Sequence, residues 1–303
     1  MRGLLPDKLK DADISFETAH LNNGQSYNSI IIMAKDEAIA PRINIDNLYS
    51  DWLNGDSLDY VAMDICNKRE AADKDMYDKQ KAVEHYLNDP DSAREHIVRS
   101  LVNTEYNKDS LVSRPHEEMA DMSYVYHIAV EGKESASRVE VTYDLMEKLG
   151  IEEKELKTLS ERNTAKLEPA KVETLYKMLD LPIEEDEPQM IVITNESGVY
   201  GASAVLYPET DEKIRDYLKG DYYILPSSVH EVIAVKKDSD RTLINLRNMV
   251  RDVNTNEVDI SDRLSNNVYE RNGDVLEIAK TAWERSTERD VSRPAARSSE
   301  IEL

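Results

Sequence analysis

Apolar and polar residues alternate on both sides of Asn23-Gly24 in residues 14–33, "ISFETAHLNNGQSYNSIIIM". A period of two places successive side chains on opposite faces of a strand, and an Asn-Gly pair supplies the positive φ angles of a tight hairpin turn. Residues 267–279, "NVYERNGDVLEIA", repeat the pattern around Asn272-Gly273. Because a hairpin joins antiparallel neighbours, both segments predict sheets built mostly from antiparallel strands.

Apolar residues at helical spacing follow the first hairpin. In residues 46–87 they recur at steps of three and four, which is typical of helices with one buried face. These residues are Leu48, Trp52, Leu58, Val61, Ala62 and Ile65. Asp56-Ser57 offers an N-cap for the second of two such helices. Residues 89–115 fit either a helix or a strand, because "HIVRSLV" suits both.

The rest of the chain mixes the two patterns. Strands are expected in "MADMSYVYHIAVEG" and at the start of "SRVEVTYDLMEKLG", where Thr142 caps a following helix, and residues 151–180 predict two helices separated at Pro169. Further strands are predicted in "MIVITN", "GASAVLY", "YYIL" and "EVIAVK", and further helices in "ETDEKIRDYLKG" and "RTLINLRNMVRDVNTNEV". The sum is an α+β fold, in which helices pack on mostly antiparallel sheets.

An acidic run bounded by prolines, "LPIEEDEPQ" at residues 181–189, is the best candidate for a linker or a long loop. As a linker it would separate an N-terminal α+β region at residues 1–180 from a C-terminal α+β region at residues 189–279. As a loop it would lie inside a single domain. Residues 280–303 are polar and contain arginine, serine and proline, and they predict a weakly helical or disordered tail.

The chain of 303 residues carries 61 acidic and 38 basic side chains, a formal net charge of −23. Such a field repels nucleic-acid phosphates and anionic lipids, which disfavours direct binding to either, and it suits a basic protein partner. The same charge also keeps an intracellular protein soluble. No apolar segment has the length of a signal peptide or a membrane span, so we expect a cytoplasmic protein.

Cysteine and tyrosine usage narrows the chemistry. The single cysteine, Cys66, excludes an internal disulfide and a cysteine-based metal cluster, and its helical neighbours predict a buried position. The chain has 16 tyrosines, one phenylalanine and two tryptophans. Tyrosine suits interfaces because its ring is apolar while its hydroxyl tolerates water. Tyr124, Tyr126, Tyr222 and Tyr223 fit half-buried strand positions, and the sequence favours the core over an interface for tyrosines of this kind.

Residues 222–235, "YYILPSSVHEVIAV", contain the strongest candidate for nucleophilic catalysis. Ser228 would need a base such as His230 within hydrogen-bond reach, with Glu231 nearby. The glycines that flank the serine of a nucleophile elbow are absent, and in an extended chain Ser228 and His230 would lie about 7 Å apart. The sequence therefore favours a turn between two strands, in which serine hydroxyls bond to backbone amides.

The segment "RPHEEMADMSYVYH" begins like the zinc motif HExxH at His116-Glu117, but Ala120 occupies the position of the second histidine. A helix needs both imidazoles at i and i+4 to share one metal. Pro115 and the acidic residues after His116 predict the start of a helix or turn, and His127 falls in an alternating strand. Because glycine-rich phosphate loops are also absent, we expect no metal and no cofactor.

Four phrases occur in the order in which a known bacterial family has them: "NTEYNKDSLVSRPHEEMADMSYVYHIAV", "SERNTAKLEP", "GASAVLYPE" and "DYYILPSSVHEVIAV". Through them the chain resembles domain-of-unknown-function family 5688 from Leu4 to the hairpin at Asn272-Gly273. The resemblance implies a cytoplasmic α+β protein of gut anaerobes, often encoded near mobile elements, with no established activity or catalytic residue. Family members usually begin with an additional N-terminal helix, so the resemblance also implies a shortened start.

Two functions are consistent with these features. The sequence favours a non-catalytic protein that binds a basic protein partner through an acidic, tyrosine-bearing surface, with no oligomeric state defined. In its sharpest form, given the mobile-element setting, it is a counter-defence factor whose carboxylates stand in for phosphates and block the nucleic-acid groove of a host protein. The alternative is a hydrolase-type enzyme that uses His230 or His116 with a neighbouring serine or glutamate, for which Ser228 and Glu117 are the candidates.

Overall fold

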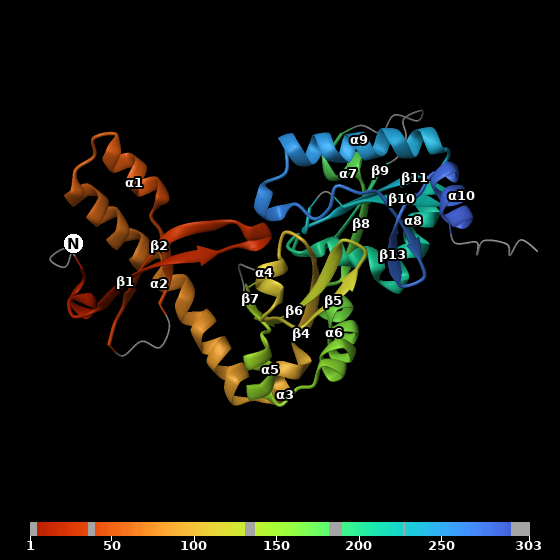
Figure 1. Ribbon diagram of the computed structural model, residues 1–303. Helices are drawn as coiled ribbons and strands as arrows, with labels where there is room; N and C mark the ends of the chain where they lie inside the picture. The colour runs from red at the N-terminus through yellow and green to blue at the C-terminus, as the bar shows by residue number, and fades with distance from the viewer. Residues whose placement is uncertain (1–4, 36–39, 131–136, 182–189, 227, 292–303) are drawn as a thin grey trace, which may run out of the picture. The chain divides into compact units, whose positions relative to one another are not determined.

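Figure 1 shows the computed structural model of the chain. The residues that the structure describes are 5–35, 40–130, 137–181, 190–226 and 228–291. Contacts divide the chain into two compact units, which are Met1–Pro169 with Asp259–Arg263 and Ala170–Val258 with Leu264–Leu303. Both units combine helices with antiparallel strands, which confirms the predicted α+β fold.

The first unit begins with a three-stranded sheet and two helices. The strand order is β1 (Asp13–His20), β2 (Ser26–Met33) and β3 (Arg42–Asn44), preceded by the 3₁₀ helix η2 (Asp7–Leu9). Helices α1 (Asp46–Leu53) and α2 (Leu58–Asn88) follow the sheet in the chain. Ser57 caps α2 as predicted, because its hydroxyl accepts the Tyr60 N–H at 3.2 Å. The shared core contains Leu9, Ile30, Ile32, Ile43, Leu48, Ile65 and Cys66, so the cysteine is buried as expected.

The first hairpin has the two predicted strands but a longer connection than a tight turn. His20 pairs with Ser26, so residues 21–25 join the strands, and Asn22–Gly24 forms one 3₁₀ turn, η3. Asn23 and Gly24 have φ angles of 56° and 66°, which these residue types adopt more readily than others. The loop is extended because the Asn23 side chain bonds to the backbone carbonyls of Ile260 and Arg263, far along the chain.

A second sheet completes the first unit. Its central strand β6 (Met122–Val130) pairs with β4 (Ile97–Asn103) along one edge and with β5 (His116–Met119) and β7 (Ser137–Glu140) along the other. The ambiguous segment around "HIVRSLV" is therefore a strand. The helices are α3 (Pro90–Glu95), α4 (Lys108–Leu111), α5 (Tyr143–Leu149) and α6 (Glu153–Leu167). Thr142 caps α5 as predicted, accepting the Leu145 N–H at 3.2 Å.

The second unit is built on a six-stranded antiparallel sheet with the order β13-β12-β10-β11-β9-β8. The strands are β8 (Ala170–Thr174), β9 (Met190–Asn195), β10 (Tyr222–Leu225), β11 (Val232–Lys236), β12 (Tyr269–Asn272) and β13 (Val275–Ile278). The helices are α7 (Leu175–Met178), η4 (Gly201–Leu206), α8 (Pro208–Leu218), α9 (Asp240–Asn256) and α10 (Ala282–Val291), and η5 (Ile260–Asp262) lies in the segment assigned to the first unit. Asn272 pairs with Val275, which confirms the second predicted hairpin.

Two segments differ from the expected secondary structure. Residues 170–174, "AKVET", form β8 instead of a helix, because they pair with β9 along their whole length, and such pairing outweighs a weak helix propensity. "GASAVLY" forms η4 instead of a strand. A Cβ on Gly201 would lie 2.5 Å from the Asn195 backbone nitrogen and 2.7 Å from the His230 carbonyl oxygen, so the absence of a side chain lets this segment pack directly on the end of β9.

The acidic run at residues 181–189 lies between two paired strands. Because β8 and β9 are neighbours in one sheet, the run connects strands of the second unit, and the division between the units falls after Pro169. Residues 182–189, and the predicted tail beyond α10 at residues 292–303, lie outside the described residues. None of the described helices combines the length and the apolar character of a membrane-spanning segment.

Candidate functional site

Ser228 lies in the connection between β10 and β11 and is buried. Its hydroxyl accepts the backbone N–H groups of His230 at 2.9 Å and Glu231 at 3.3 Å, and it donates to Glu231 Oε1 at 3.1 Å. The hydroxyl thus caps the turn, and its proton is held by a carboxylate. Ser227 lies outside the described residues.

His230 is held by the loop that precedes η4. Its Nδ1 accepts the Tyr200 N–H at 3.2 Å, and its carbonyl oxygen accepts the Thr194 hydroxyl at 2.8 Å. The Tyr200 ring lies beside the imidazole with 5.6 Å between centroids. His230 thus links the backbone of Tyr200 to Thr194 near the end of β9. These bonds assign the histidine a structural role.

His116 and Glu117 lie on β5, and the expected start of a helix or turn after Pro115 is wrong. The segment is a strand because it pairs with β6 from His116–Val125 to Met119–Met122. His116 Nδ1 lies 2.9 Å from the Arg114 carbonyl oxygen, and Glu117 accepts from Lys157 Nζ at 2.6 Å. Among the described residues, no group of three or more histidine, cysteine, aspartate or glutamate side chains could hold a metal ion.

His127 is a buried histidine on β6. Burial, with the nearby Arg138 and Arg114 guanidinium groups, lowers its pKa well below the ordinary value. Its Nδ1 lies 3.4 Å from the Ser100 hydroxyl. Arg138 in turn pairs with Glu168 at 2.6 Å, and only 4% and 10% of the two side chains are exposed. We interpret this cluster as the polar interior of the second sheet, since buried charges persist where they are paired.

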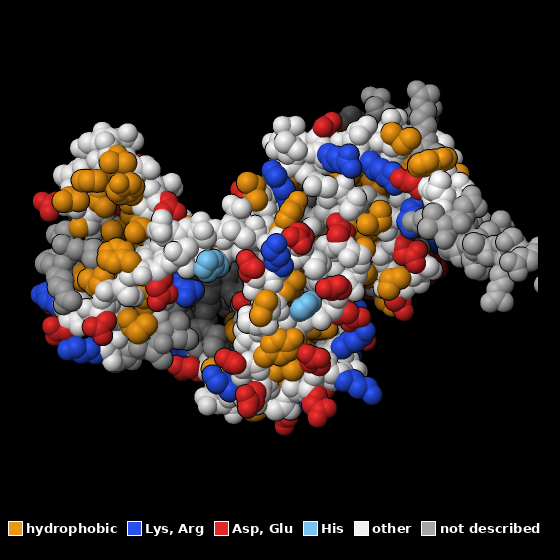
Figure 2. Space-filling model, viewed as in Figure 1, with side chains coloured by type: hydrophobic (Ala, Val, Ile, Leu, Met, Phe, Trp, Pro, Cys, Tyr) orange, Lys and Arg blue, Asp and Glu red, His pale blue; other side chains and the backbone are white. Residues whose placement is uncertain are grey.

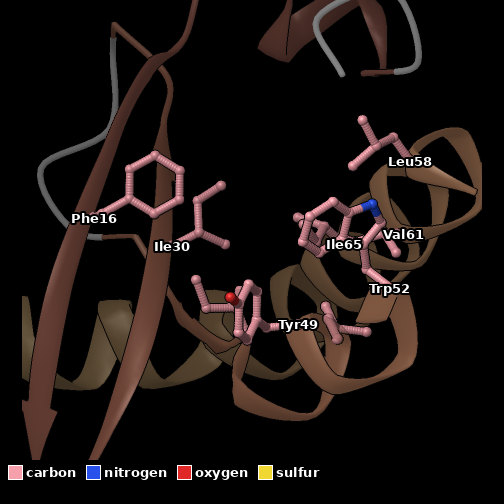
Figure 3. Close-up of a pocket in the computed structure, with 9 residues that line it drawn as sticks. Phe16, Ile30, Tyr49, Trp52, Leu58, Val61 and Ile65 are labelled. Atoms are coloured by element: carbon pink, nitrogen blue, oxygen red, sulfur yellow. The ribbon is translucent and has the colours of Figure 1, made fainter. Parts of the chain in front are cut away.

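An apolar groove is the strongest candidate for a binding site. It lies in the first unit, has a volume of about 280 Å³, and is formed by the β1–β2 hairpin, the residues after β3, and helices α1 and α2. Its nine lining residues, which define the apolar groove, are Phe16, Ile30, Ile45, Leu48, Tyr49, Trp52, Leu58, Val61 and Ile65. In Figure 3, Phe16 and Ile30 project from the strands and face the helical side chains across the groove.

Local structure sets the position of each wall. Phe16 stands opposite Ile30 in the hairpin register, so both side chains lie on one face of the sheet. In α1, Leu48 is buried and anchors the helix. Tyr49 and Trp52 are three residues apart on α1, and their rings lie 5.8 Å from each other. Together these elements present aromatic side chains from a strand and a helix to the same space.

The large side chains of the groove are unusually exposed. Phe16 is 70% exposed, Leu58 68%, Tyr49 61% and Trp52 42%. Phe16 is the chain's only phenylalanine, and Trp52 is one of its two tryptophans. Full burial of such a side chain stabilises by about 1.5–3 kcal/mol, so exposed aromatic residues gathered at a cavity indicate a surface that a partner covers. Figure 2 shows hydrophobic side chains gathered over the part of the molecule that α1 occupies in Figure 1.

Sequence periodicity did not identify this site. Trp52 and Leu58 were expected on buried helix faces, and the structure exposes both. Helical spacing shows that a face is apolar but not whether another element covers it. The signal that could have found the groove is the placement of the one phenylalanine on a hairpin strand. By contrast, the tyrosines on strands β6 and β10 are buried, in line with the predicted strand positions. They are Tyr124, Tyr126, Tyr222 and Tyr223.

Exposed aspartates flank the groove-lining residues of α1 and α2 in the sequence. Residues 41–65 contain five aspartates, one arginine, no lysine and no glutamate. Among the described residues, Asp46 bonds to Asn28 and Asp64 to Lys68. Asp51, Asp56 and Asp59 are exposed, take part in no ion pair there, and lie next to or near Trp52 and Leu58 in the chain. The corner between α1 and α2, which supplies Trp52 and Leu58 to the groove, therefore carries unneutralised negative charge.

The sequence profile of the family of unknown function DUF5688 matches residues 2–271. The chain belongs to this family. The match confirms the resemblance drawn from the four phrases, and in this DUF5688 protein it includes the whole apolar groove and the turn at Ser228. No curated protein and no solved structure matches the chain.

Proposed function

We propose that this DUF5688 protein is a non-catalytic binding protein that recognises a basic partner protein through the apolar groove. The observation that carries the proposal is the set of exposed aromatic side chains, Phe16, Tyr49 and Trp52, around one cavity. Aromatic residues in a pocket are the usual anchors of protein interfaces. The proposal places the protein in the cytoplasm, where a lone buried thiol such as Cys66 is common.

The lining of the groove, more than its size, favours a protein partner over a small ligand. Pockets for cofactors and drug-sized ligands occupy roughly 300–1,000 Å³ and include a few polar groups that orient the ligand. The apolar groove has about 280 Å³ and is lined by aliphatic and aromatic side chains. It therefore suits a few apolar side chains that a partner inserts.

Charge favours a basic partner. The net charge of −23 attracts cations over distances of about 10 Å at moderate salt. The exposed Asp51, Asp56 and Asp59 direct that attraction to the groove. Complementary charge of this kind speeds association and rejects acidic competitors.

The narrower hypothesis, mimicry of nucleic acid in a mobile-element counter-defence factor, would need carboxylates in rows at phosphate-like spacing. On the face shown in Figure 2, acidic and basic side chains are interspersed. The proposal therefore rests on the apolar groove. Mimicry of nucleic acid is a more specific hypothesis within it. The hydrolase alternative gains no support from the turn at Ser228, because the hydroxyl accepts the backbone N–H groups of His230 and Glu231 and donates to the Glu231 carboxylate, while the His230 ring accepts from Tyr200.

Affinity purification from bacterial lysate tests the proposal. The bait would be the full chain as wild type, as the groove variant Phe16→Ala/Trp52→Ala, and as Trp283→Ala, which alters an exposed tryptophan that does not line the groove. We expect the wild type and Trp283→Ala to recover the same basic protein, the groove variant to lose it, and added salt to weaken the recovery. Equal recovery by the groove variant would contradict the proposal.

A further inference from the structure

We infer that the partner element filling the apolar groove is an amphipathic α-helix with lysine or arginine near its apolar face. This inference rests on the proposed function and adds the conformation and charge pattern of the occupant. It is carried by three properties of the described residues: the apolar lining, the volume, and the exposed aspartates that flank lining residues in the chain.

The lining decides the conformation of the occupant. All nine lining residues are aliphatic or aromatic, so their side chains offer few hydrogen-bond partners, and the backbone groups beside the groove that could pair with a peptide are those on the outer edge of β1. An extended peptide would carry unpaired N–H and C=O groups into this surface, and each unpaired group that is buried costs about 1–3 kcal/mol. A helix pairs these groups within itself and presents only side chains. The lining side chains therefore favour a helix, and addition of an extended peptide to the edge of β1 is the competing mode that the test must exclude.

The volume decides how many side chains enter. An apolar cavity of about 150 Å³ holds a benzene-sized group, so the 280 Å³ of the apolar groove holds about two leucine- or phenylalanine-sized side chains. Residues at i and i+3 or i+4 of a helix lie about 5–6 Å apart between their Cβ atoms. Two such residues on one helix would fill the space, as in other helix-in-groove complexes.

The exposed aspartates indicate the charge of the partner helix. Asp51 precedes Trp52 and Asp59 follows Leu58 in the chain, so exposed carboxylates flank lining residues of both helices on neighbouring helix faces. Lysine or arginine flanking the inserted side chains would meet these carboxylates. The same charge repels fatty acids and anionic lipids, which are the other apolar ligands that could enter such a groove.

A pair of synthetic peptides tests this inference. Both would have about 18 residues, long enough for a helix to form on binding, and the same number of leucines and lysines. In the helical isomer leucine recurs at i, i+3, i+4 and i+7, whereas in the alternating isomer it occupies every second position. Because charge and composition are equal, non-specific attraction to the acidic protein is equal. Fluorescence anisotropy of the labelled peptides at about 150 mM salt would measure binding to the full chain.

We expect the helical isomer to bind about tenfold more tightly than the alternating isomer, and Phe16→Ala/Trp52→Ala to abolish that difference. Trp283→Ala is the matched control and should leave it unchanged. The charge variant Asp51→Asn/Asp56→Asn/Asp59→Asn should weaken binding about three- to tenfold and reduce its salt dependence. Circular dichroism of the complex should show helix formation by the peptide.

Other outcomes separate the inference from the proposed function. Equal, groove-dependent binding of both isomers would overturn the helix and leave the groove as a protein-binding site. Binding of neither isomer, with groove-dependent recovery of a lysate protein, would overturn the inference alone. Groove-dependent binding of dodecanoate without peptide binding, or a dimer that dissociates in Phe16→Ala/Trp52→Ala, would assign the groove to a lipid or to a second copy. No effect of the groove variant in either assay would overturn both.

Discussion

Asn23 and Asn107 hold each other by two hydrogen bonds, because the Asn23 backbone N–H donates to Asn107 Oδ1 at 2.9 Å and Asn107 Nδ2 donates to Asn23 Oδ1 at 2.9 Å. Both residues are buried. Asn23 Nδ2 also donates to the carbonyl oxygens of Ile260 and Arg263. One asparagine therefore joins the first hairpin, the loop after β4 and the returning segment Asp259–Arg263 within the first unit.

Removing this junction should destabilise the first unit. Asn23→Gly keeps a residue that tolerates the φ of 56° but deletes the side-chain bonds, so we expect a loss of about 1–3 kcal/mol in the free energy of unfolding, as for Asn107→Ala. The double variant should lose less than the sum, since the two side chains share a bond. Urea denaturation of the full chain measures each value, and additive losses would contradict a shared junction.

The hairpin at Asn23 also shows how far sequence reasoning reaches. Alternation is a local property, so the strands on both sides and the positive φ angles were predictable. The length of the loop was not, because Asn23 is fixed by Ile260, which lies 237 positions away. The same limit explains β8, whose pairing with β9 bridges a run that local patterns identify only as a loop or linker.

The apolar groove marks a second limit. Leu48 and Trp52 occupy one helical stripe, yet Leu48 is buried and Trp52 is 42% exposed. Their spacing is the same as in any buried face, and only the three-dimensional arrangement shows where the covering layer ends. The turn at Ser228 was easier to predict from the sequence. The absent glycines and the flanking strands already favoured a capped turn, and the hydroxyl makes those bonds.

The hydroxyl of Ser228 should be needed for stability. Ser228→Ala deletes the acceptor of two backbone N–H groups, as loss of a helix cap does, and we expect a cost of about 1 kcal/mol. Thermal unfolding measures this cost. Ser286→Ala is the control, because Ser286 is on the exposed side of α10 and its hydroxyl donates only to the Trp283 carbonyl. Unchanged stability of Ser228→Ala together with loss of a measurable hydrolysis would favour the enzyme hypothesis instead.

Gly201 and Ser203 should respond to substitution in opposite ways. A Cβ on Gly201 would lie 2.5 Å from the backbone nitrogen of Asn195, so Gly201→Ala must displace backbone and should cost about 1–3 kcal/mol or more. Within the described residues, Ser203 Oγ is buried and has no hydrogen-bond partner. Ser203→Ala should therefore be neutral or slightly stabilising. Differential scanning calorimetry compares them, and a reversed order would contradict the packing of η4 on β9.

His127 should make the first unit sensitive to mild acid. Burial and the guanidinium groups of Arg138 and Arg114 lower its pKa in the folded chain, whereas in the unfolded chain it titrates near 6.5. The unfolded state therefore binds more protons below that pH, so the stability contribution is complete above about pH 6.5 and is lost as the pH falls toward the lower folded value. Unfolding free energies between about pH 7.5 and 5 should decline by up to ~1.4 kcal/mol per pH unit. His127→Gln should flatten this slope, whatever its effect on absolute stability, and His116→Gln, on the exposed part of β5, should retain it. A wild-type stability that is constant over this range would show that His127 is not held neutral by its surroundings.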